Sequence, residues 1–284
     1  MNQKVRRSFL IVVLMTMSII YEGCSYYKES EKESAKETFQ FVDVKGVEYE
    51  APLLENVPMN TYDYDLLSKK NGYPCYTDKD GKVISKLGID VSEYQNPVNW
   101  QQVKNAGVEY VMIRVGYRGY GEEGRLVEDA MFRSHMEGAV AAGLEVGVYF
   151  FSQAINEKET LEEVQFVLDR IKEYPVTYPV VYDTEEIKDD VARTDNLTEE
   201  QFTQNCITFC DAIREAGYDT MIYANMKWMA FTLDMRKLTE YEKWYADYEP
   251  VPQCPYEFSM WQYTETGQLP GIEGNVDLNL WFEE

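Results

Sequence analysis

From Leu87 onward, short apolar runs rich in β-branched residues alternate with longer amphipathic segments. The predicted strands are residues 87–91, 110–115, 144–151, 180–183, 220–224, 241–248 and 258–263, and the predicted helices are residues 100–106, 127–142, 157–173 and 198–216. Gly107, Gly143 and Gly217 follow three of the helices, which suits the left-handed residue that commonly ends a helix. Strands joined through helices pair in parallel, so we predict an α/β fold with a parallel (β/α) barrel.

Residues 1–24 have the pattern of a signal peptide. Basic residues precede an apolar stretch, residues 9–21, which is too short for a comfortable membrane span. The stretch leads to Gly23 and Cys24 and resembles a bacterial lipoprotein signal, so we expect lipidation at Cys24 and a membrane anchor. Ordinary secretion and an uncleaved anchor are the alternatives. All three place the remaining chain outside the cytoplasm.

Three segments are expected after the signal peptide. Residues 25–50 are predicted as a charged tether, because their first half is rich in Lys, Glu and Ser and nearly free of aliphatic side chains. Residues 51–87 are predicted as an N-terminal extension that packs on the barrel, with a hairpin turn at Asp80-Gly81. Residues 88–284 make up the predicted barrel.

Charge and composition exclude several classes of function. A net charge of -23 argues against nucleic acid as a partner, because phosphate binding needs a basic surface. The single histidine, His135, lies in a helical pattern and is interpreted as a packing or surface residue, so no His-rich metal site and no Ser-His-Asp triad is expected. No metal or cofactor is predicted. Cys206 and Cys210 share a helix face and are interpreted as core residues, with a disulfide as the alternative.

One glycine pattern imitates a dinucleotide-binding site. Residues 119–124 have the spacing G-x-G-x-x-G between a predicted strand and a predicted helix. Such a site needs an acid at the end of the next strand, but that strand ends in residues 149–153 without one. Glu122 and Glu123 would also repel a pyrophosphate. We therefore interpret this loop as the wall of a groove.

Acidic residues gather where the predicted strands end. The buried strand 180–183 leads into Asp183-Thr184-Glu185, and alternation along a strand puts Asp183 and Glu185 on one face. Neighbouring carboxyl groups push their pKa values apart, as glycoside hydrolysis requires, although an acidic strand exit on an acidic protein is the plainer interpretation. Asp90 and Asp247 also lie near predicted strand ends, and Asp277 follows the last one. Reactive groups of such barrels sit at this end.

An ordered set of motifs, spanning residues 88–284, resembles the glycoside hydrolase family 25 lysozymes, the Chalaropsis-type N-acetylmuramidases. The motifs are Gly88-Ile-Asp-Val-Ser-Glu-Tyr-Gln95, Ile113-Arg-Val-Gly116, Tyr178-Pro-Val-Val-Tyr-Asp-Thr-Glu185, Gly217-Tyr-Asp-Thr-Met-Ile-Tyr-Ala-Asn225, Trp261-Gln-Tyr263 and Gly274-Asn-Val-Asp-Leu-Asn279. The resemblance implies an incomplete (β/α) TIM-like barrel with fewer helices than strands. It also implies a monomer that hydrolyses the β-1,4 bond between N-acetylmuramic acid and N-acetylglucosamine in the glycan strands of peptidoglycan.

The same resemblance implies roles for individual acids. Glu185 would be the general acid, and Asp183 would orient the 2-acetamido group of the substrate or stabilise the positive charge of the transition state. Asp90 and Asp277 would hold the surrounding hydrogen-bond network. Whether hydrolysis is retaining, inverting or assisted by the acetamide stays open, because the sequence gives no distance between carboxyl groups.

The resemblance further implies substrate contacts at Tyr149, Tyr223, Trp261 and Gln262, although each aromatic residue is equally well interpreted as core. Phe150 departs from the family, since many relatives have His there. A chitinase-like site is a weaker alternative, because the residues before Asp183 are apolar. A tethered protein that binds the cell wall without turnover is the alternative from another class.

Overall fold

The computed structural model describes residues 37–187 and 190–283. The predicted signal peptide, Cys24 and residues 25–36 of the predicted tether lie outside the described residues. The chain divides into two compact units, Met1–Phe39 and Gln40–Glu284, and the features below belong to the second unit, apart from the first residues of β1. Among the described residues, no helix combines the length and the apolar character that a membrane span requires.

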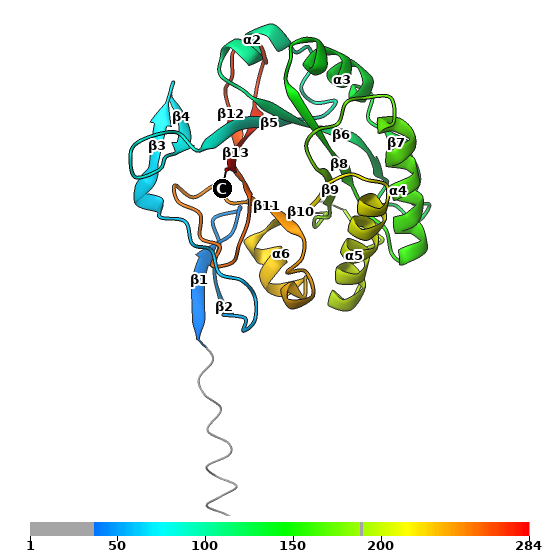
Figure 1. Ribbon diagram of the computed structural model, residues 1–284. Coiled ribbons are helices and arrows are strands. Elements are labelled where there is room, and N and C mark those ends of the chain that lie inside the picture. The colour runs from blue at the N-terminus through cyan, green and yellow to red at the C-terminus, as the bar shows by residue number, and fades with distance from the viewer. Residues whose placement is uncertain (1–36, 188–189, 284) are drawn as a thin grey trace, which may run out of the picture. The chain divides into compact units, whose positions relative to one another are not determined.

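Eight strands close into a barrel (Figure 1). In ring order they are β5 (Ser85–Val91), β6 (Tyr110–Arg118), β8 (Glu145–Phe151), β9 (Val180–Asp183), β10 (Thr220–Asn225), β11 (Glu242–Ala246), β12 (Met260–Gly267) and β13 (Val276–Phe282), and β13 returns to β5. A ninth strand, β7 (Leu126–Glu128), pairs with β6 outside the ring. The predicted α/β barrel is thus confirmed at the level of the strands.

Helices pack on the outside of the ring (Figure 1). The described helices are α2 (Trp100–Asn105), α3 (Phe132–Ala141), α4 (Glu157–Ile171), α5 (Glu199–Glu215) and α6 (Met226–Phe231), with 3-10 turns η1 (Tyr64–Leu66) and η2 (Met235–Lys237). Side chains of Asn99, Asn156, Thr198 and Asn225 accept backbone N–H bonds at four helix starts, which explains where these helices begin. The described part therefore has fewer α-helices than barrel strands, as expected.

The barrel is not parallel throughout. Strand β13, which the sequence pattern did not predict, runs antiparallel to both β12 and β5. Because its direction is reversed, its first residues lie beside the carboxyl ends of its neighbours. Asp277 is therefore the second residue of β13, directly opposite Asp90, and not a residue after the last strand.

One predicted helix begins later than expected. Residues 127–142 read as one helix, but Leu126–Glu128 form β7 and α3 begins only at Phe132. Between them, the Asp129 side chain accepts a bond from the backbone N–H of Met131 and pairs with Arg114. These tertiary contacts override the local helical pattern of this short stretch.

Large side chains fill the barrel interior and determine where space is left. The central cluster consists of Tyr110, Met112, Val181, Met221, Tyr223, Trp244, Ala246 and Met260. The Tyr110 ring lies so close to the backbone of β5 that a Cβ atom on Gly88 would collide with it. Because these side chains fill the rest of the interior, the open space of the barrel lies at the carboxyl ends of its parallel strands.

The segment before the barrel contains two short sheets. β1 (Thr38–Val42) and β2 (Glu48–Pro52) form a two-stranded sheet that spans the end of the predicted tether and the start of the predicted extension. β3 (Leu67–Lys70) and β4 (Tyr73–Tyr76) form a hairpin whose turn, Asn71-Gly72, has positive φ at both residues. The turn at Asp80-Gly81 also forms and is closed by a bridge between Thr77 and Val83.

Ring contacts join the extension to the barrel, since Tyr62 stacks on Phe282 with ring centroids 4.2 Å apart.

Four described cysteines, Cys75, Cys206, Cys210 and Cys254, are buried free thiols.

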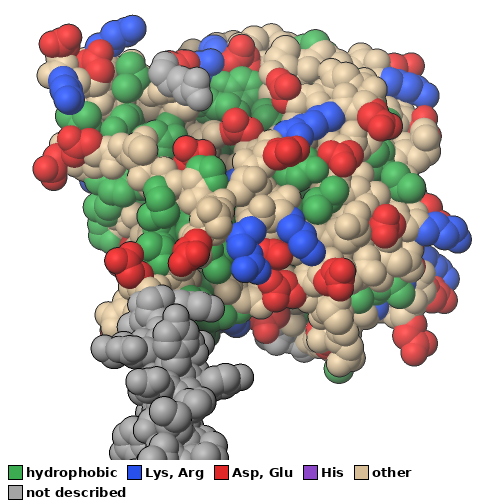
Figure 2. Space-filling view, turned by 60° about the horizontal axis from the view of Figure 1, so that its bottom comes forward, with side chains coloured by type: hydrophobic (Ala, Val, Ile, Leu, Met, Phe, Trp, Pro, Cys, Tyr) green, Lys and Arg blue, Asp and Glu red, His purple; other side chains and the backbone are tan. Residues whose placement is uncertain are grey.

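Acidic side chains are spread across the face shown in Figure 2 and are not gathered into one patch.

Candidate active site

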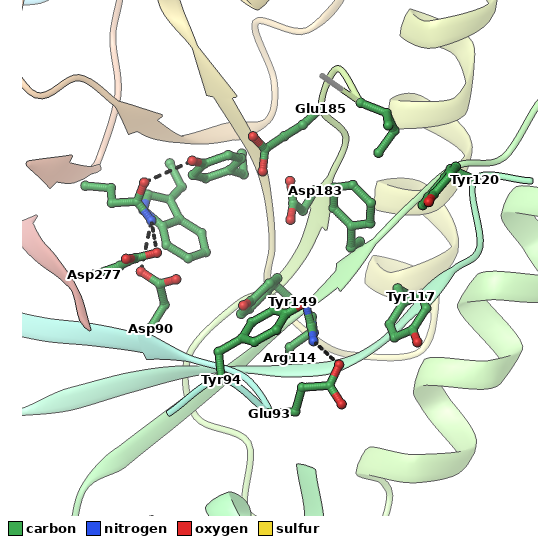
Figure 3. Close-up of a pocket in the computed structure, with 15 residues that line it drawn as sticks. Asp90, Glu93, Tyr94, Arg114, Tyr117, Tyr120, Tyr149, Asp183, Glu185 and Asp277 are labelled. Carbon is green, nitrogen blue, oxygen red and sulfur yellow. Dashed lines mark hydrogen bonds and ion pairs between the residues drawn. The ribbon is translucent and has the colours of Figure 1, made fainter. Parts of the chain in front are cut away.

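A pocket of about 450 Å³ opens at the carboxyl ends of the parallel strands (Figure 3). Its lining residues are Asp90, Glu93, Tyr94, Arg114, Tyr117, Tyr120, Tyr149, Phe151, Asp183, Glu185, Ile187, Tyr223, Trp244, Gln262 and Asp277. In this view Asp90 and Asp277 lie on one side, Tyr117 and Tyr120 on the other, and Asp183 and Glu185 between them. The structure thus brings all four predicted acids into one pocket.

Asp183 is the last residue of β9 and is 5% exposed. Its Oδ1 atom has no hydrogen-bond partner, and burial raises the pKa of this carboxyl well above its usual range. The negative charges of Glu185 and Asp90 raise the pKa further, and only Arg114 opposes them. A buried carboxyl group in this state is stabilised poorly by the protein and is available to a ligand.

Glu185 follows two residues later and is half-buried on the pocket wall. Its backbone carbonyl accepts a 3.3 Å bond from the Gln153 amide, which is itself held by the Thr194 hydroxyl at 2.8 Å. Glu186 does not line the pocket and pairs instead with Lys45 and Lys227. Successive acids after this strand therefore point in different directions, as the alternation of side chains along a strand predicts.

Asp90 and Asp277 form a second pair of carboxyl groups. Asp90 Oδ2 accepts bonds from Gln262 at 3.0 Å and from Asn279 at 2.8 Å. Burial, followed by the charge of Asp90, raises the pKa of Asp277 to about 9. Asp277 therefore keeps its proton at neutral pH and shares it with Asp90 in a hydrogen bond.

Gln262 connects the acids to the aromatic wall. Its Oε1 atom accepts bonds from the hydroxyls of Tyr223 at 2.9 Å and Tyr248 at 3.0 Å, while its Nε2 atom donates to Asp90. These contacts use both ends of the amide. The geometry gives Gln262 the role of orienting Asp90 in addition to its place on the pocket wall.

Aromatic residues of the wall were predicted in part. Tyr149 and Tyr223 line the pocket and both pack edge-on against Trp244, which also lines it. Trp261 is not among the residues that line it, and its predicted contact with substrate stays a prediction. Trp261 is adjacent to Gln262 on β12 and so points to the opposite face, where its indole N–H donates to the carbonyl of Asp247 at 2.7 Å.

Sequence reasoning missed the charged group opposite the acids. Arg114 pairs with Asp129 at 2.7 Å and with Glu93 at 3.1 Å. Its guanidinium lies 5.4 Å from the ring centroids of both Tyr94 and Tyr117. An arginine among the apolar residues of the predicted strand 110–115 was a signal that a buried charge is needed there.

Two other sequence features are placed by the structure. Phe150, the departure from the family, is buried and packs against Phe166 of α4, so it lies outside the pocket. The loop of residues 119–124 contributes Tyr120 to the pocket wall. His135 is buried, with its ring nitrogen 3.0 Å from the carbonyl of Ser92, and is a packing residue.

The barrel holds paired carboxyl groups at the carboxyl ends of its strands, in a pocket with aromatic walls. This is the architecture of a glycoside hydrolase. The chain belongs to the glycosyl hydrolases family 25, because the model of that family matches residues 89–272, more than half of the chain.

Two curated relatives are lysozymes. The autolytic lysozyme of Clostridium acetobutylicum is 25% identical over 193 residues, which cover 68% of this chain and 54% of that protein. Lysozyme M1 of Streptomyces globisporus is 25% identical over 201 residues, covering 68% of this chain and 66% of that one. The chain thus spans between about half and two thirds of the length of these relatives.

Solved structures share the fold. The modular autolysin LytC of Streptococcus pneumoniae, solved in complex with a synthetic peptidoglycan ligand, has a TM-score of 0.62 at 22% identity, covering 86% of this chain and 56% of that chain. A family 25 glycosyl hydrolase of Bacillus anthracis has a TM-score of 0.58 at 18% identity, covering 70% of this chain and 89% of that chain. At these identities the likeness concerns the fold alone.

Proposed function

We propose that this protein is a peptidoglycan hydrolase that acts outside the cytoplasm and cleaves the β-1,4 bond between N-acetylmuramic acid and N-acetylglucosamine. The observation that carries the proposal is the convergence of Asp90, Asp183, Glu185 and Asp277 on one pocket. Membership of family 25 and the likeness to two lysozymes support the choice of substrate.

Glu185 is the proposed general acid, which protonates the oxygen of the leaving sugar. Its half-buried position on the pocket wall gives it access to substrate, and the Gln153 amide fixes its backbone. A positioned acid of this kind contributes about 100-fold to 10,000-fold in rate.

Asp183 is the proposed partner of Glu185. Its unbonded Oδ1 atom is suited to the 2-acetamido group of the substrate or to the positive charge that develops at the anomeric carbon. Such interactions are strong in a buried site, because water does not compete for them.

Asp90 and Asp277 are proposed to maintain the pocket and not to react. Their shared proton and the bonds from Gln262 and Asn279 keep one side of the pocket at a defined charge. Tyr149, Tyr223 and Trp244 offer ring surfaces to the apolar faces of sugars.

Anchoring through a lipid on Cys24 is the remaining part of the proposal. An anchored enzyme has a high effective concentration at the wall, which compensates for the lack of long-range attraction between a chain of net charge -23 and an anionic wall. Mass spectrometry of the mature protein should find Cys24 at the N-terminus, carrying lipid. An unmodified Cys24, or a signal peptide that is not cleaved, would contradict lipidation as the anchor.

Digestion of purified peptidoglycan by residues 25–284 tests the reaction, with products reduced by borohydride and identified by mass spectrometry. Reduced N-acetylmuramic acid at the new ends is the expected result. Reduced N-acetylglucosamine would instead indicate a glucosaminidase. Wall binding without new reducing ends would favour the tethered, non-catalytic alternative.

Glu185→Gln is the variant with the largest expected effect on the reaction. It should lower turnover at least about 100-fold, because the amide cannot donate the proton, while the thermal midpoint stays unchanged. Glu173→Gln, the same change on an exposed residue, is the matched control. Near-normal turnover of Glu185→Gln would overturn the assignment.

A further inference from the structure

The N-terminal hairpin, residues 40–52, lies outside the part of the chain that matches the family, which begins at residue 89. Its turn is held by Asp43, whose Oδ1 atom accepts bonds from the backbone N–H groups of Lys45 and Val47, both at 2.9 Å. Gly46 provides the left-handed conformation that the turn requires, with φ of 79°. The turn therefore presents Lys45 at a defined position.

An aromatic cluster anchors the hairpin on α6, the helix that follows β10. Phe41 is 2% exposed and stacks on Tyr49 with ring centroids 5.5 Å apart. Phe231 of α6 completes the cluster, with its ring centroid 6.2 Å from that of Phe41 and 5.9 Å from that of Tyr49. Burial of the Phe41 ring against the other two rings stabilises the hairpin in one place.

A glutamine ties the hairpin to the loop after β11, residues 247–253. The backbone N–H of Val42 donates to Gln253 Oε1 at 2.8 Å, and Gln253 Nε2 donates to the Val42 carbonyl at 3.0 Å. The backbone N–H of Gln253 donates to Asp247 Oδ2 at 2.8 Å. The same loop holds Tyr248, which bonds Gln262 and through it reaches Asp90.

A second contact reaches the loop after β9, residues 184–187. Lys45 Nζ lies 3.6 Å from Glu186 Oε2, and Lys227 Nζ lies 3.5 Å from the same oxygen. Glu186 directly follows Glu185 in the chain. The hairpin thus contacts both loops. The loop after β9 carries Glu185, and the loop after β11 carries Tyr248, which bonds Gln262.

We propose that the N-terminal hairpin is a positioning element of the active site, which fixes the loops after β9 and β11 from outside the family domain. This inference rests on the proposed function, because it takes Glu185 as the general acid. Misplacement of a catalytic group by about 1 Å can lower turnover about 100-fold, whereas ground-state binding needs less exact alignment. The hairpin should therefore affect kcat more than KM.

The test compares two variants of residues 25–284 on soluble glycan fragments. Gln253→Ala removes the tie to Val42, together with the bonds that Gln253 Nε2 donates to the Asp247 carboxylate within the loop, and should lower kcat about tenfold, with KM changed less than about twofold. Gln101→Ala removes only a side-chain bond to Asn105 on exposed α2 and should leave both constants unchanged. Hydrogen exchange of residues 247–253 should become faster in Gln253→Ala only.

Unchanged kcat in Gln253→Ala would overturn the proposal, whatever its exchange rates. If that variant does not fold, Lys45→Glu decides, because it alters only an exposed contact: a loss of about threefold in kcat supports positioning, and full turnover overturns it. If the native chain does not cleave peptidoglycan, the proposed function fails separately. Faster exchange of residues 184–187 in Lys45→Glu, which changes only a contact of the hairpin, then still supports the hairpin's role, and unchanged exchange overturns it.

Discussion

Two clusters of polar side chains lie on opposite sides of the barrel wall, and the carboxyl groups in them are stabilised differently. The acid cluster, Asp90, Asp183, Glu185 and Asp277, faces the pocket. The Arg118 cluster lies under α4 and consists of Arg118, Glu163, Ser152 and Tyr182. Glu163 in it is fully buried, with Oε1 2.7 Å from Arg118 Nε and Oε2 2.7 Å from the Ser152 hydroxyl.

The difference lies in what surrounds each carboxyl group. Burial raises the pKa of Glu163 to about 7, while Ser152 and Arg118 hold it down. Burial and then the negative charge of Asp90 raise the pKa of Asp277 to about 9, and no basic group lowers it as Arg118 lowers that of Glu163. Burial of an acid therefore does not by itself mark a candidate active site. Like charges, together with the unbonded oxygen of Asp183, distinguish the candidate site from the Arg118 cluster.

The larger of the effects expected for this comparison separates the two clusters by activity. Asp183→Asn should lower turnover about 100-fold to 10,000-fold while stability stays equal or rises, because repulsion from Glu185 and Asp90 is removed. Initial rates and urea denaturation measure the two quantities. Asp169→Asn, on the exposed side of α4, is the control. If Asp183→Asn lowered the free energy of unfolding while the folded fraction kept its turnover, Asp183 would have a structural role only.

The Arg118 cluster should give the opposite result. Glu163→Ala leaves Arg118 buried without its closest counter-charge and should cost about 3–5 kcal/mol in unfolding free energy, with turnover of the folded protein unchanged. Glu162→Ala removes a neighbouring but exposed partner of Arg118 and should cost less than about 1 kcal/mol. Equal losses in the two variants would contradict the comparison.

Asp277→Asn tests the shared proton. Asp277 binds its proton more tightly in the folded chain, so its contribution to stability falls as pH rises from the usual carboxyl pKa of about 4 towards about 9. The amide cannot ionise, so the variant should gain stability relative to the native chain across that range and should keep its activity at the alkaline end. Urea denaturation and rates at several pH values measure this. A constant difference in stability would show that Asp277 is already ionised at neutral pH.

The smallest expected effect concerns two tryptophans. Trp261→Phe should cost about 1 kcal/mol through the lost bond to the Asp247 carbonyl and leave KM unchanged. Trp244→Phe should raise KM, because Trp244 lines the pocket and supports Tyr149 and Tyr223. A higher KM in Trp261→Phe alone would support the prediction that Trp261 contacts substrate.

Local sequence patterns predicted most of this fold. The strand 180–183 was predicted with its observed bounds, because a β-branched run entered through proline has few alternatives. The four acids were found because each lies at a strand end or in a motif of the family. The stretch 127–131 was predicted wrongly as helix, since contacts of Asp129 with Arg114 are long-range and leave no periodic signal.

Local spacing along the chain was enough to predict the alternation of strands and helices, the family, and the four acids that line the pocket. It did not predict that β13 runs antiparallel and places Asp277 against Asp90, or that Arg114 and Trp244 line the same pocket. Nor did it predict that the hairpin of residues 40–52 contacts the loops after β9 and β11. Strand direction, barrel closure and pKa shifts depend on which distant residues meet, and spacing along the chain does not specify these encounters.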